Sequence, residues 1–389
     1  MEKYKLSELI VIKNGRDHKD LPNGDYPVFG SGGIMRYVNS YLYDKPSVLL
    51  PRKGSLSNIQ YSDTPFWTVD TLYYTEINEE LVSPYYLYRY LRLLDMSRLD
   101  SGTGVPSMTF DSYYNINVFL PNIEEQRRVA SILQKIDAKI ALNRQINDNL
   151  EAMAKQLYDY WFVQFDFQNE DGKPYKSSGG AMVWNEKLKR EIPKGWHCGT
   201  LLDIAEYTNG LACQKYRPTD ENKLPVIKIK EMHDGLSVDT EWVKADIPDD
   251  VKVFDGDVLF SWSASLEVML WAYGNGGLNQ HIFKVTSKNG YPRSFYFYQL
   301  VHYIGVFKQM AEARKTTMGH ITQDHLRQST IVLPPDVDIA NKLEEKLCPI
   351  FDAIVKNSQE IMTFTKQRDE LLPLLMNGQA SVNYHLSAC

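Results

Sequence analysis

Several short segments of the chain combine basic or hydroxyl side chains with glycine. The segment 51–55 reads Pro-Arg-Lys-Gly-Ser and follows an apolar run. Glycine permits close backbone approach, and arginine or lysine can bind phosphate or form paired hydrogen bonds with guanine. These residue types predict contacts with DNA. The candidate DNA-contacting residues are Arg52, Lys53, Gly54, Ser55, Thr103, Ser107, Thr109, Lys228, Lys230, Ser261, Ser263, Lys315, Thr316, Thr317, His320 and Thr322.

Recognisable catalytic and cofactor motifs are missing from the sequence. It has no Gly-x-x-x-x-Gly-Lys-Ser/Thr phosphate loop, no Gly-x-Ser-x-Gly nucleophile elbow and no Asn-Pro-Pro-Tyr motif. The turn Gly30–Gly33 lacks the last glycine of a dinucleotide fingerprint, because Met35 stands there. His320 and His325 are five residues apart, which does not stack them for zinc binding on a helix. The sequence therefore predicts a non-catalytic chain that binds no cofactor and no metal.

Composition and charge restrict the kinds of partner. The chain has 389 residues, 43% of them hydrophobic and 24% charged, which is typical of a globular protein with several domains. It has 43 basic and 49 acidic residues and a net charge of −6. A negative total argues against binding nucleic acid through overall positive charge. Any such binding is expected to be local or shared with partner proteins.

The compartment is expected to be the cytoplasm. No apolar run reaches the roughly 18 residues of a membrane span, and the first residues lack the apolar stretch of a signal peptide. The cysteines form no Cys-x-x-Cys pair, so neither a disulfide framework nor structural zinc is expected. They are Cys198, Cys213, Cys348 and Cys389.

The chain contains an internal repeat. Asn14-Gly15 recurs 195 positions later as Asn209-Gly210, and Val48-Leu49 recurs 210 positions later as Val258-Leu259. Residues 136–138 find their counterpart 215 positions later. An offset that grows along the chain indicates insertions in the loops of two homologous halves. The counterpart of the basic segment 51–55 is Ser-Trp-Ser-Ala-Ser at 261–265, which has no charge, as expected if each half recognises a different target.

Each half divides into a mixed part and a helical part. The first part has short apolar runs between Gly, Pro and Asn residues, with one helix expected near 85–94 and its partner near 295–307. This predicts an α+β chain of two homologous α/β domains. The second part has the 3,4 spacing of a long helix. The expected seam residues are Leu133, Ile136, Ile140, Asn143, Asn147, Leu150 and Leu157 in the first half, and Leu347, Ile350, Ile354, Ile361, Phe364, Leu371 and Leu375 in the second.

Two such seams are expected to pack against each other as an antiparallel coiled coil with a pseudo-two-fold repeat. The alternative is that each helix packs only on its own globule. Buried asparagines weaken such a pairing but can fix its register. The predicted domains are 1–121 and 195–335 for the two globules, 122–165 and 336–377 for the helices, 166–194 for a linker, and 378–389 for a tail.

The ordered motifs resemble those of one family, the specificity subunits of type I restriction-modification enzymes. The resemblance covers essentially the whole chain. It rests on the segments 26–30 (Tyr-Pro-Val-Phe-Gly), 51–55, 104–107 (Gly-Val-Pro-Ser), 120–121 (Leu-Pro), 124–129 (Glu-Glu-Gln-Arg-Arg-Val), 133–137 and 191–196 (Glu-Ile-Pro-Lys-Gly-Trp). The second half departs from this pattern, because it lacks both the Glu-Glu-Gln-Arg-Arg helix start and the Arg-Lys pair.

The resemblance implies two target recognition domains that each read one part of a split DNA sequence. It also implies two long antiparallel helices that hold these domains apart and dock two methyltransferase subunits, which methylate adenine at N6. Two restriction subunits driven by ATP would join the full complex. S-adenosylmethionine, ATP and Mg would then belong to the partner subunits.

Two other functions stay open from the residues alone. One is a coiled-coil scaffold that binds only protein. The other is a DNA-modifying enzyme whose active site carries no recognisable motif. An isolated chain that cut or methylated DNA would favour the enzyme, whereas an unchanged DNA preference after exchange of residues 1–121 would favour the scaffold.

Overall fold

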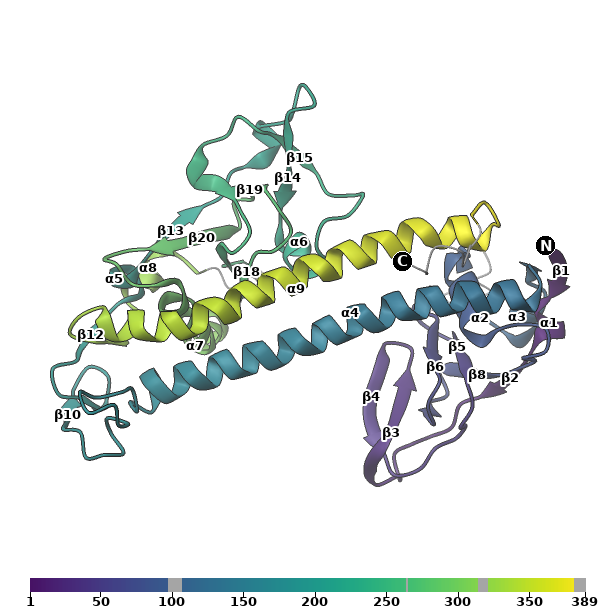
Figure 1. Cartoon of the computed structure of the whole chain (residues 1–389), viewed down its shortest axis with the longest axis horizontal. Helices are drawn as coiled ribbons and strands as arrows, with labels where there is room; N and C mark the ends of the chain where they lie inside the picture. Colours follow the sequence, from purple (N-terminus) through teal and green to yellow (C-terminus); the bar gives the residue numbers. More distant parts are fainter. Residues whose placement is uncertain (97–106, 264, 314–320, 381–389) are drawn as a thin grey trace, which may run out of the picture. The chain divides into compact units, whose positions relative to one another are not determined.

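The chain folds into two compact units that share two long helices. The computed structural model describes residues 1–96, 107–263, 265–313 and 321–380. Unit 1 consists of Met1–Lys139 and the chain from Phe364 onward, and unit 2 consists of Ile140–Thr363. The helices α4 (Ile123–Tyr158) and α9 (Asp338–Met376) each contribute residues to both units (Figure 1).

The described residues of the unit 1 globule form three small sheets and several short helices. The four-stranded sheet has the order β2-β8-β5-β6, and a three-stranded sheet has the order β4-β3-β7, in which β3 and β7 are parallel. The described elements are β1 (Glu2–Lys5), α1 (Leu6–Leu9), β2 (Ile10–Asn14), β3 (Asn23–Gly30), β4 (Gly33–Val38), β5 (Ser47–Pro51), β6 (Gln60–Ser62), β7 (Trp67–Thr68), β8 (Leu72–Ile77), α2 (Pro84–Leu93), α3 (Phe110–Tyr114) and β9 (Asn117–Leu120).

Unit 2 repeats this arrangement with additions. The order β13-β20-β17-β18 corresponds to β2-β8-β5-β6, and β15-β14-β19-β16 extends the three-stranded sheet by one strand. The described elements are β12 (His197–Gly199), α5 (Leu201–Ile204), β13 (Ala205–Asn209), η3 (Cys213–Lys215), β14 (Lys223–Ile227), α6 (Ile229–Asp234), β15 (Trp242–Lys244), η4 (Asp249–Val251), β16 (Lys252–Val253), β17 (Val258–Ser261), β18 (Glu267–Leu270), β19 (Gly276–Leu278), β20 (Ile282–Ser287), α7 (Arg293–Ala313), α8 (Gln323–Arg327) and β21 (Ile331–Leu333).

The repeated Asn-Gly pairs have a common structural reason. A Cβ atom on Gly15 would lie 2.1 Å from the carbonyl oxygen of Val69, and one on Gly210 would lie 2.3 Å from that of Asn279. Only glycine lets these two backbone segments approach so closely. The prediction of two repeated domains with mixed helix and sheet is thereby confirmed in the matching sheet orders and in this close approach.

The segment between the halves has more structure than a linker. The end of α4 continues as one π-helical turn, η2 (Asp159–Val163). A β-hairpin then forms from β10 (Met182–Asn185) and β11 (Arg190–Pro193). Phe165 and Phe167 on the near side of this hairpin pack against the ring of Trp196. The turn-rich composition of 166–194 therefore encodes a small folded element packed on unit 2.

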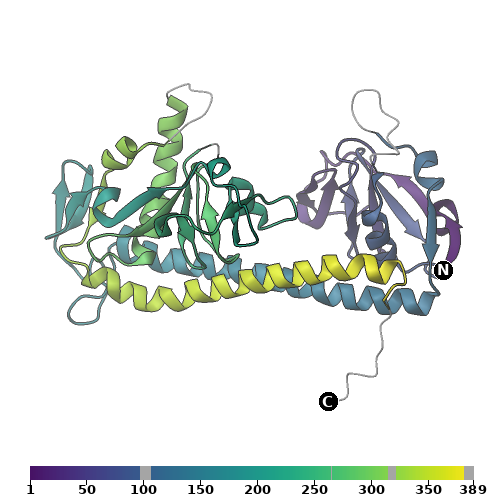
Figure 2. The ribbon, with the colours of Figure 1, turned by 90° about the horizontal axis from the view of Figure 1, so that it is seen from above.

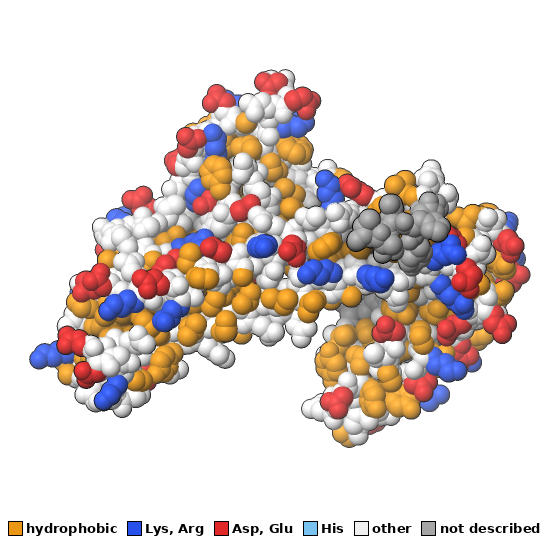
Figure 3. Space-filling view, in the orientation of Figure 1, with side chains coloured by type: hydrophobic (Ala, Val, Ile, Leu, Met, Phe, Trp, Pro, Cys, Tyr) orange, Lys and Arg blue, Asp and Glu red, His pale blue; other side chains and the backbone are white. Residues whose placement is uncertain are grey.

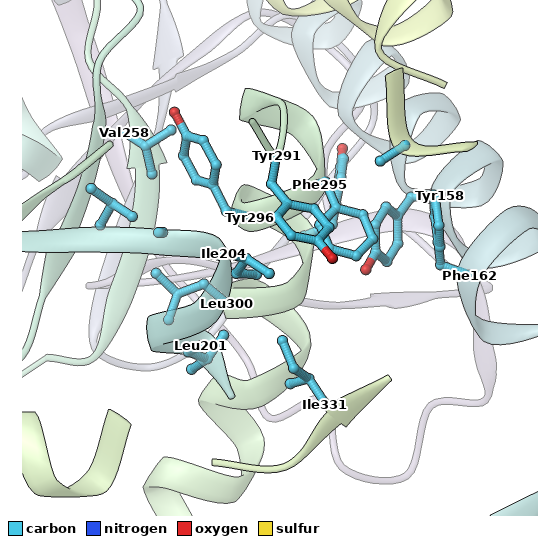
Figure 4. Packing of buried hydrophobic residues seen from close by; sticks show 14 of the residues in the cluster. Tyr158, Phe162, Leu201, Ile204, Val258, Tyr291, Phe295, Tyr296, Leu300 and Ile331 are labelled. Carbon is cyan, nitrogen blue, oxygen red and sulfur yellow. The ribbon is translucent and has the colours of Figure 1, made fainter. Parts of the chain in front are cut away.

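The core of unit 2 joins the globule to the long helices. Tyr158 on α4 and Phe162 on η2 pack against Phe295 on α7, with ring centroids 6.3 and 4.8 Å away (Figure 4). Leu347 and Phe351 on α9 are buried in the same cluster. Burial of large aromatic rings is the main source of such packing energy, so the helices and globule of this unit form one body.

Within unit 2, α4 and α9 run side by side and antiparallel (Figures 1 and 2). The Asn147 side chain donates to the Ile354 carbonyl at 3.3 Å and accepts from the Asn357 side chain at 3.1 Å. One turn earlier on α4, Asn143 donates to the Glu360 carboxylate at 2.9 Å. Both α4 asparagines are buried, and a shift of register would leave their amides without these partners.

Within unit 1, the start of α4 meets the end of α9. Leu133 of α4 and Leu375 and Met376 of α9 are buried in one cluster with the core of the globule. The Arg368 guanidinium lies 3.0 Å from the Asp137 carboxylate. Both helix ends therefore pack on the globule as well as on each other. The sequence left these two kinds of packing open as alternatives, and unit 1 contains both.

The predicted seam residues fall into three groups by burial. Leu133, Ile140, Asn143, Asn147, Leu347, Ile354 and Leu375 are buried, and Ile136, Leu150, Leu157, Ile350, Ile361 and Phe364 are partly buried. Leu371 corrects the prediction, because it is 37% exposed and its neighbour Leu372 is 7% exposed. The last turns of α9 face the core of unit 1, which Leu372 enters, so the globule decides the buried face there.

Two kinds of feature are absent from the described residues. None of the described helices is both long and apolar enough to cross a membrane. Across the same residues, no group of three His, Cys, Asp or Glu side chains is placed to hold a metal ion.

Candidate nucleic-acid interface

In unit 1, two of the predicted segments lie next to each other. Strand β5 ends at Pro51, and the backbone N–H of Arg52 donates to the Thr71 carbonyl at 2.9 Å. The backbone N–H of Met108 in turn donates to the Arg52 carbonyl at 3.0 Å. The backbones of Lys53 and Ser107 pair in an isolated antiparallel β-bridge. The structure thus brings the start of the segment 51–55 to the segment 107–109.

The side chain of Arg52 rests on an aromatic ring. Its guanidinium carbon lies 6.0 Å from the centroid of the Tyr73 ring, and Nη1 donates to the Asp70 carbonyl at 3.3 Å. The Tyr73 hydroxyl donates to the Met108 carbonyl at 3.3 Å. Burial raises the pKa of this hydroxyl, and the charge of Arg52 acts in the opposite direction. Tyr73 therefore stays a neutral donor that joins the two segments and supports the guanidinium.

The neighbouring residues differ in how accessible they are. Lys53 and Ser55 are exposed, and Gly54 has a φ of +93°, where glycine is favoured. Within the described part of the chain, Lys53 has no carboxylate partner, which leaves its charge available to an anion. Thr109 is the N-cap of α3 and accepts from the Ser112 N–H at 3.2 Å, so its hydroxyl already has a structural use.

A cavity of about 730 Å³ lies beside Arg52. Asp70 and Thr71, which both bond Arg52, line it. The backbone N–H groups of Lys19 and His18 donate to the Asp17 carboxylate at this cavity and lower its pKa. The remaining lining residues are Gly30, Ser31, Gly32, Met35 and Val69. The cavity therefore brings the glycine turn that resembled a dinucleotide fingerprint next to the basic segment.

Unit 2 has the same backbone frame with other side chains. The backbone N–H of Trp262 donates to the His281 carbonyl at 3.4 Å, and the backbone N–H of Ile321 donates to the Trp262 carbonyl at 3.1 Å. The indole centroid lies 5.9 Å from that of Phe283. Trp262 and Phe283 therefore stand where Arg52 and Tyr73 stand in unit 1.

The serines of this segment correct the sequence prediction. Ser261 and Ser263 are 0% and 6% exposed, and the Ser261 hydroxyl donates to the Ser263 carbonyl at 3.2 Å. Buried hydroxyls bonded to the backbone do not reach a duplex. Trp262 between them is the partly exposed side chain.

The remaining predicted contact residues either already have partners within the protein or lie outside the described residues. Lys228 forms an ion pair with Glu241, and Lys230 lies 4.0 Å from Asp239, so carboxylates already compensate both charges. Thr322 is the N-cap of α8, where its N–H donates to His325 Nδ1 at 3.0 Å. Thr103, Lys315, Thr316, Thr317 and His320 lie outside the described residues and stay predictions from the sequence.

Several residues of the candidate interface carry no motif and were not predicted from the sequence. The aromatic supports Tyr73 and Phe283 lie about twenty residues after the segments they hold. Asn209, which accepts from the Trp262 indole N–H at 3.0 Å, lies further away still. The signal that could have found them is the repeat itself, because an offset of 210 aligns Arg52 with Trp262 and Tyr73 with Phe283.

The chain belongs to the family described as the type I restriction modification DNA specificity domain, whose family model matches residues 1–152 and 193–367.

Particular relatives span most of the chain. The type I restriction enzyme MjaIX specificity subunit of Methanocaldococcus jannaschii is 24% identical over 94% of this chain and 86% of its own length. The HindI specificity subunit of Haemophilus influenzae is 24% identical over 78% of this chain and 79% of its own. The solved S subunit of a type I restriction-modification system from M. genitalium aligns over 96% of this chain and 95% of its own, with a TM-score of 0.64 and 15% identity, and supports the fold.

Proposed function

We propose that this chain is the DNA-reading subunit of a type I restriction-modification complex and that each unit reads one part of a split target. The observation that carries the proposal is the matched pair of loops. Each unit presents a partly exposed side chain, Arg52 or Trp262, on the same hydrogen-bonded frame and the same aromatic support. A family membership that spans both halves adds to it. Such a subunit would act in the cytoplasm, where the chromosomal DNA is.

The charge distribution supports a shared rather than independent grip on DNA. Lys/Arg and Asp/Glu side chains are interspersed on the face shown in Figure 3, in line with a net charge of −6. Phosphate contacts position a protein on the duplex, and base contacts specify the sequence. In the proposal, partner subunits supply most phosphate contacts and this chain supplies base contacts, so the isolated chain binds DNA weakly.

The chemistry belongs to the partners in this proposal. Two methyltransferase subunits would bind S-adenosylmethionine and methylate adenine at N6, and restriction subunits that use ATP and Mg would join the full complex. The chain itself would be non-catalytic and would bind no cofactor and no metal.

The outer face of α4 in unit 2 is proposed as a methyltransferase docking surface. Leu142, Ile146 and Met153 are 50%, 37% and 47% exposed. Their spacing of four and seven residues places them on one side of the helix, and hydrophobic side chains are visible along it in Figure 3. A solvent-facing apolar stripe on a charged helix is typical of a surface that another helix covers.

The proposal predicts a bipartite footprint. The complex of this chain with its methyltransferase subunits should protect two short sequences separated by unread base pairs and should methylate an adenine in each. Methylated motifs mapped with and without the gene for this chain give the same information in cells. A single contiguous site, or the same methylation without this chain, would contradict the proposal.

A further inference from the structure

The strongest unassigned feature of the molecule is the pair of side chains at positions 52 and 262. The backbone N–H and carbonyl groups of both residues are already hydrogen-bonded within their own units. In unit 1, the Arg52 N–H donates to Thr71 and the Arg52 carbonyl accepts from Met108, at 2.9 and 3.0 Å. In unit 2, Trp262 makes the corresponding bonds at 3.4 and 3.1 Å. What each position presents to a ligand is therefore its side chain.

Aromatic rings beside each position support its side chain. The guanidinium of Arg52 lies over Tyr73, and the indole of Trp262 lies beside the rings of Phe283 and His281, 5.9 and 5.7 Å away. A side chain held on a ring loses less conformational freedom when it binds. Both positions are thus pre-organised, and both are partly exposed.

The two side chains carry different recognition chemistry. Arg52 has five N–H donors, and the one hydrogen bond of its guanidinium within the described residues joins Nη1 to the Asp70 carbonyl. The remaining donors match the O6 and N7 acceptors of guanine in the major groove. The indole of Trp262 has one donor, which Asn209 already accepts at 3.0 Å. The rest of the indole ring is apolar, and the apolar group that a base pair presents in the major groove is the thymine methyl.

We infer that positions 52 and 262 are the matched specificity-determining positions of the two units, with Arg52 selecting a guanine and Trp262 selecting a thymine through its methyl group. This inference rests on the proposed function and names the chemistry of its two half-sites. It requires neither residue to bind phosphate.

The test uses the complex with the methyltransferase subunits and a duplex that carries the motif mapped for the wild-type complex. In one half-site, each guanine is replaced in turn by 7-deazaguanine, which lacks the N7 acceptor. In the other, each thymine is replaced by uracil, which lacks the methyl group. For the wild-type complex, we expect one deazaguanine to weaken binding by roughly five-fold or more and one uracil to weaken it by about four-fold.

The variants identify the side chain that senses each change. Arg52→Ala should bind the deazaguanine and natural duplexes equally, and its preference should relax at one base pair of that half-site only. Trp262→Ala should lose the response to uracil in the other half-site. Trp262→Phe keeps a ring against Phe283 and should retain the thymine preference, which separates recognition from a loss of folding.

Matched control variants are available in both units. Arg92 is an exposed arginine that also lies over a tyrosine ring, 5.8 Å from the centroid of Tyr88. Trp242 is an exposed tryptophan of unit 2. Arg92→Ala and Trp242→Ala should keep both half-site preferences and both analogue responses.

The outcomes distinguish this inference from the proposed function. If the wild-type complex recognises a split motif but Arg52→Ala and Trp262→Ala weaken binding to all sequences equally, the side chains contact the backbone of the DNA and the inference is wrong. The same conclusion follows if the analogues have no effect at any position. If the wild-type complex has no sequence preference, the proposed function itself fails.

Discussion

The two units share a backbone frame and differ in what they place on it. In unit 1, the frame holds Arg52 and the exposed Lys53, and in unit 2 the same positions hold Trp262 and the buried Ser263. The hydrogen bonds that fix these positions involve backbone atoms in both units. Because these main-chain bonds do not depend on the side chains at positions 52 and 262, those two side chains can change after duplication without unfolding the unit. A charged and an uncharged loop can thus arise from one fold.

A second difference concerns the acid that the repeat places on each long helix. Asp137 on α4 contacts Arg89 and the Tyr85 hydroxyl, and it lies 3.0 Å from Arg368. Its counterpart Asp352 on α9 is bonded to Arg293 at 3.0 Å and is 66% exposed. Unit 1 therefore has an ion cluster between globule and both helices, whereas unit 2 has a surface pair and relies on aromatic packing.

The largest expected effect comes from lengthening both helices at the division between the units. We expect seven residues inserted after Lys139 in α4, with seven after Thr363 in α9, to preserve the helix faces and add about 10 Å to each helix. If the helices set the spacing, the methylated motif keeps both half-sites and gains about three unread base pairs at ~3.4 Å each. Mapping methylated motifs in cells with each variant measures this.

The control for this prediction is a pair of four-residue insertions at the same places, which turn the helix faces. These should reduce methylation at all spacings. Loss of one half-site in the seven-residue variant would contradict the prediction. It would mean that one unit needs its present position along the helices in order to fold or to recognise DNA, and that the two units are not equivalent in this respect.

The next effect tests whether both units depend on the glycine that the repeat places at equivalent positions, Gly15 and Gly210. Gly15→Ala and Gly210→Ala would each force a methyl group against a carbonyl oxygen, 2.1 and 2.3 Å away. We expect each to destabilise its own unit by about 3 kcal/mol. Hydrogen exchange should rise in β2 and β8 for the first variant and in β13 and β20 for the second. Gly32→Ala, which meets nothing within 4 Å, is the control and should have little effect.

The sequence predicted those features that depend on local pattern. The apolar run before Pro51 became β5, the aromatic run from Tyr85 became α2, and the 3,4 spacing became α4 and α9. Asn143 and Asn147 could be placed at a helix interface because they continue the 3,4 spacing between Ile140 and Leu150. The repeat offsets located both copies of the interface loop.

The features that the sequence did not predict depend on packing between distant segments. The sequence just after β17 leaves open whether Trp262 or its neighbouring serines are exposed, and the contacts of Trp262 with the Phe283 ring and the Asn209 amide decide it. Leu371 and Leu372 are equally apolar, and the core of unit 1 selects Leu372. The cluster around Asp137 combines residues from α2, α4 and α9, which no local motif joins.

A smaller effect is expected from the paired acids. Asp137→Asn leaves the 5% exposed Arg89 side chain without its charge partner, and we expect a loss of about 2–3 kcal/mol in unit 1. Asp352→Asn removes an exposed pair and should change stability by less than about 1 kcal/mol. Hydrogen exchange measured at increasing urea concentrations gives the free energy of unfolding of each unit separately. Equal losses in both variants would contradict the distinction between a cluster and a surface pair.

The smallest expected effect concerns the residues that follow positions 52 and 262. Lys53 is exposed and without a carboxylate partner among the described residues, so Lys53→Ala should weaken DNA binding by the complex uniformly across sequences and reduce the salt slope by about one unit. Ser263→Ala changes a buried, uncharged position and should leave the slope unchanged. Affinities at several salt concentrations measure both. If Lys53→Ala does not change the salt slope, this lysine makes no phosphate contact. Unit 1 would then depend on Arg52 for its contacts with DNA, as unit 2 depends on Trp262 in the inference above.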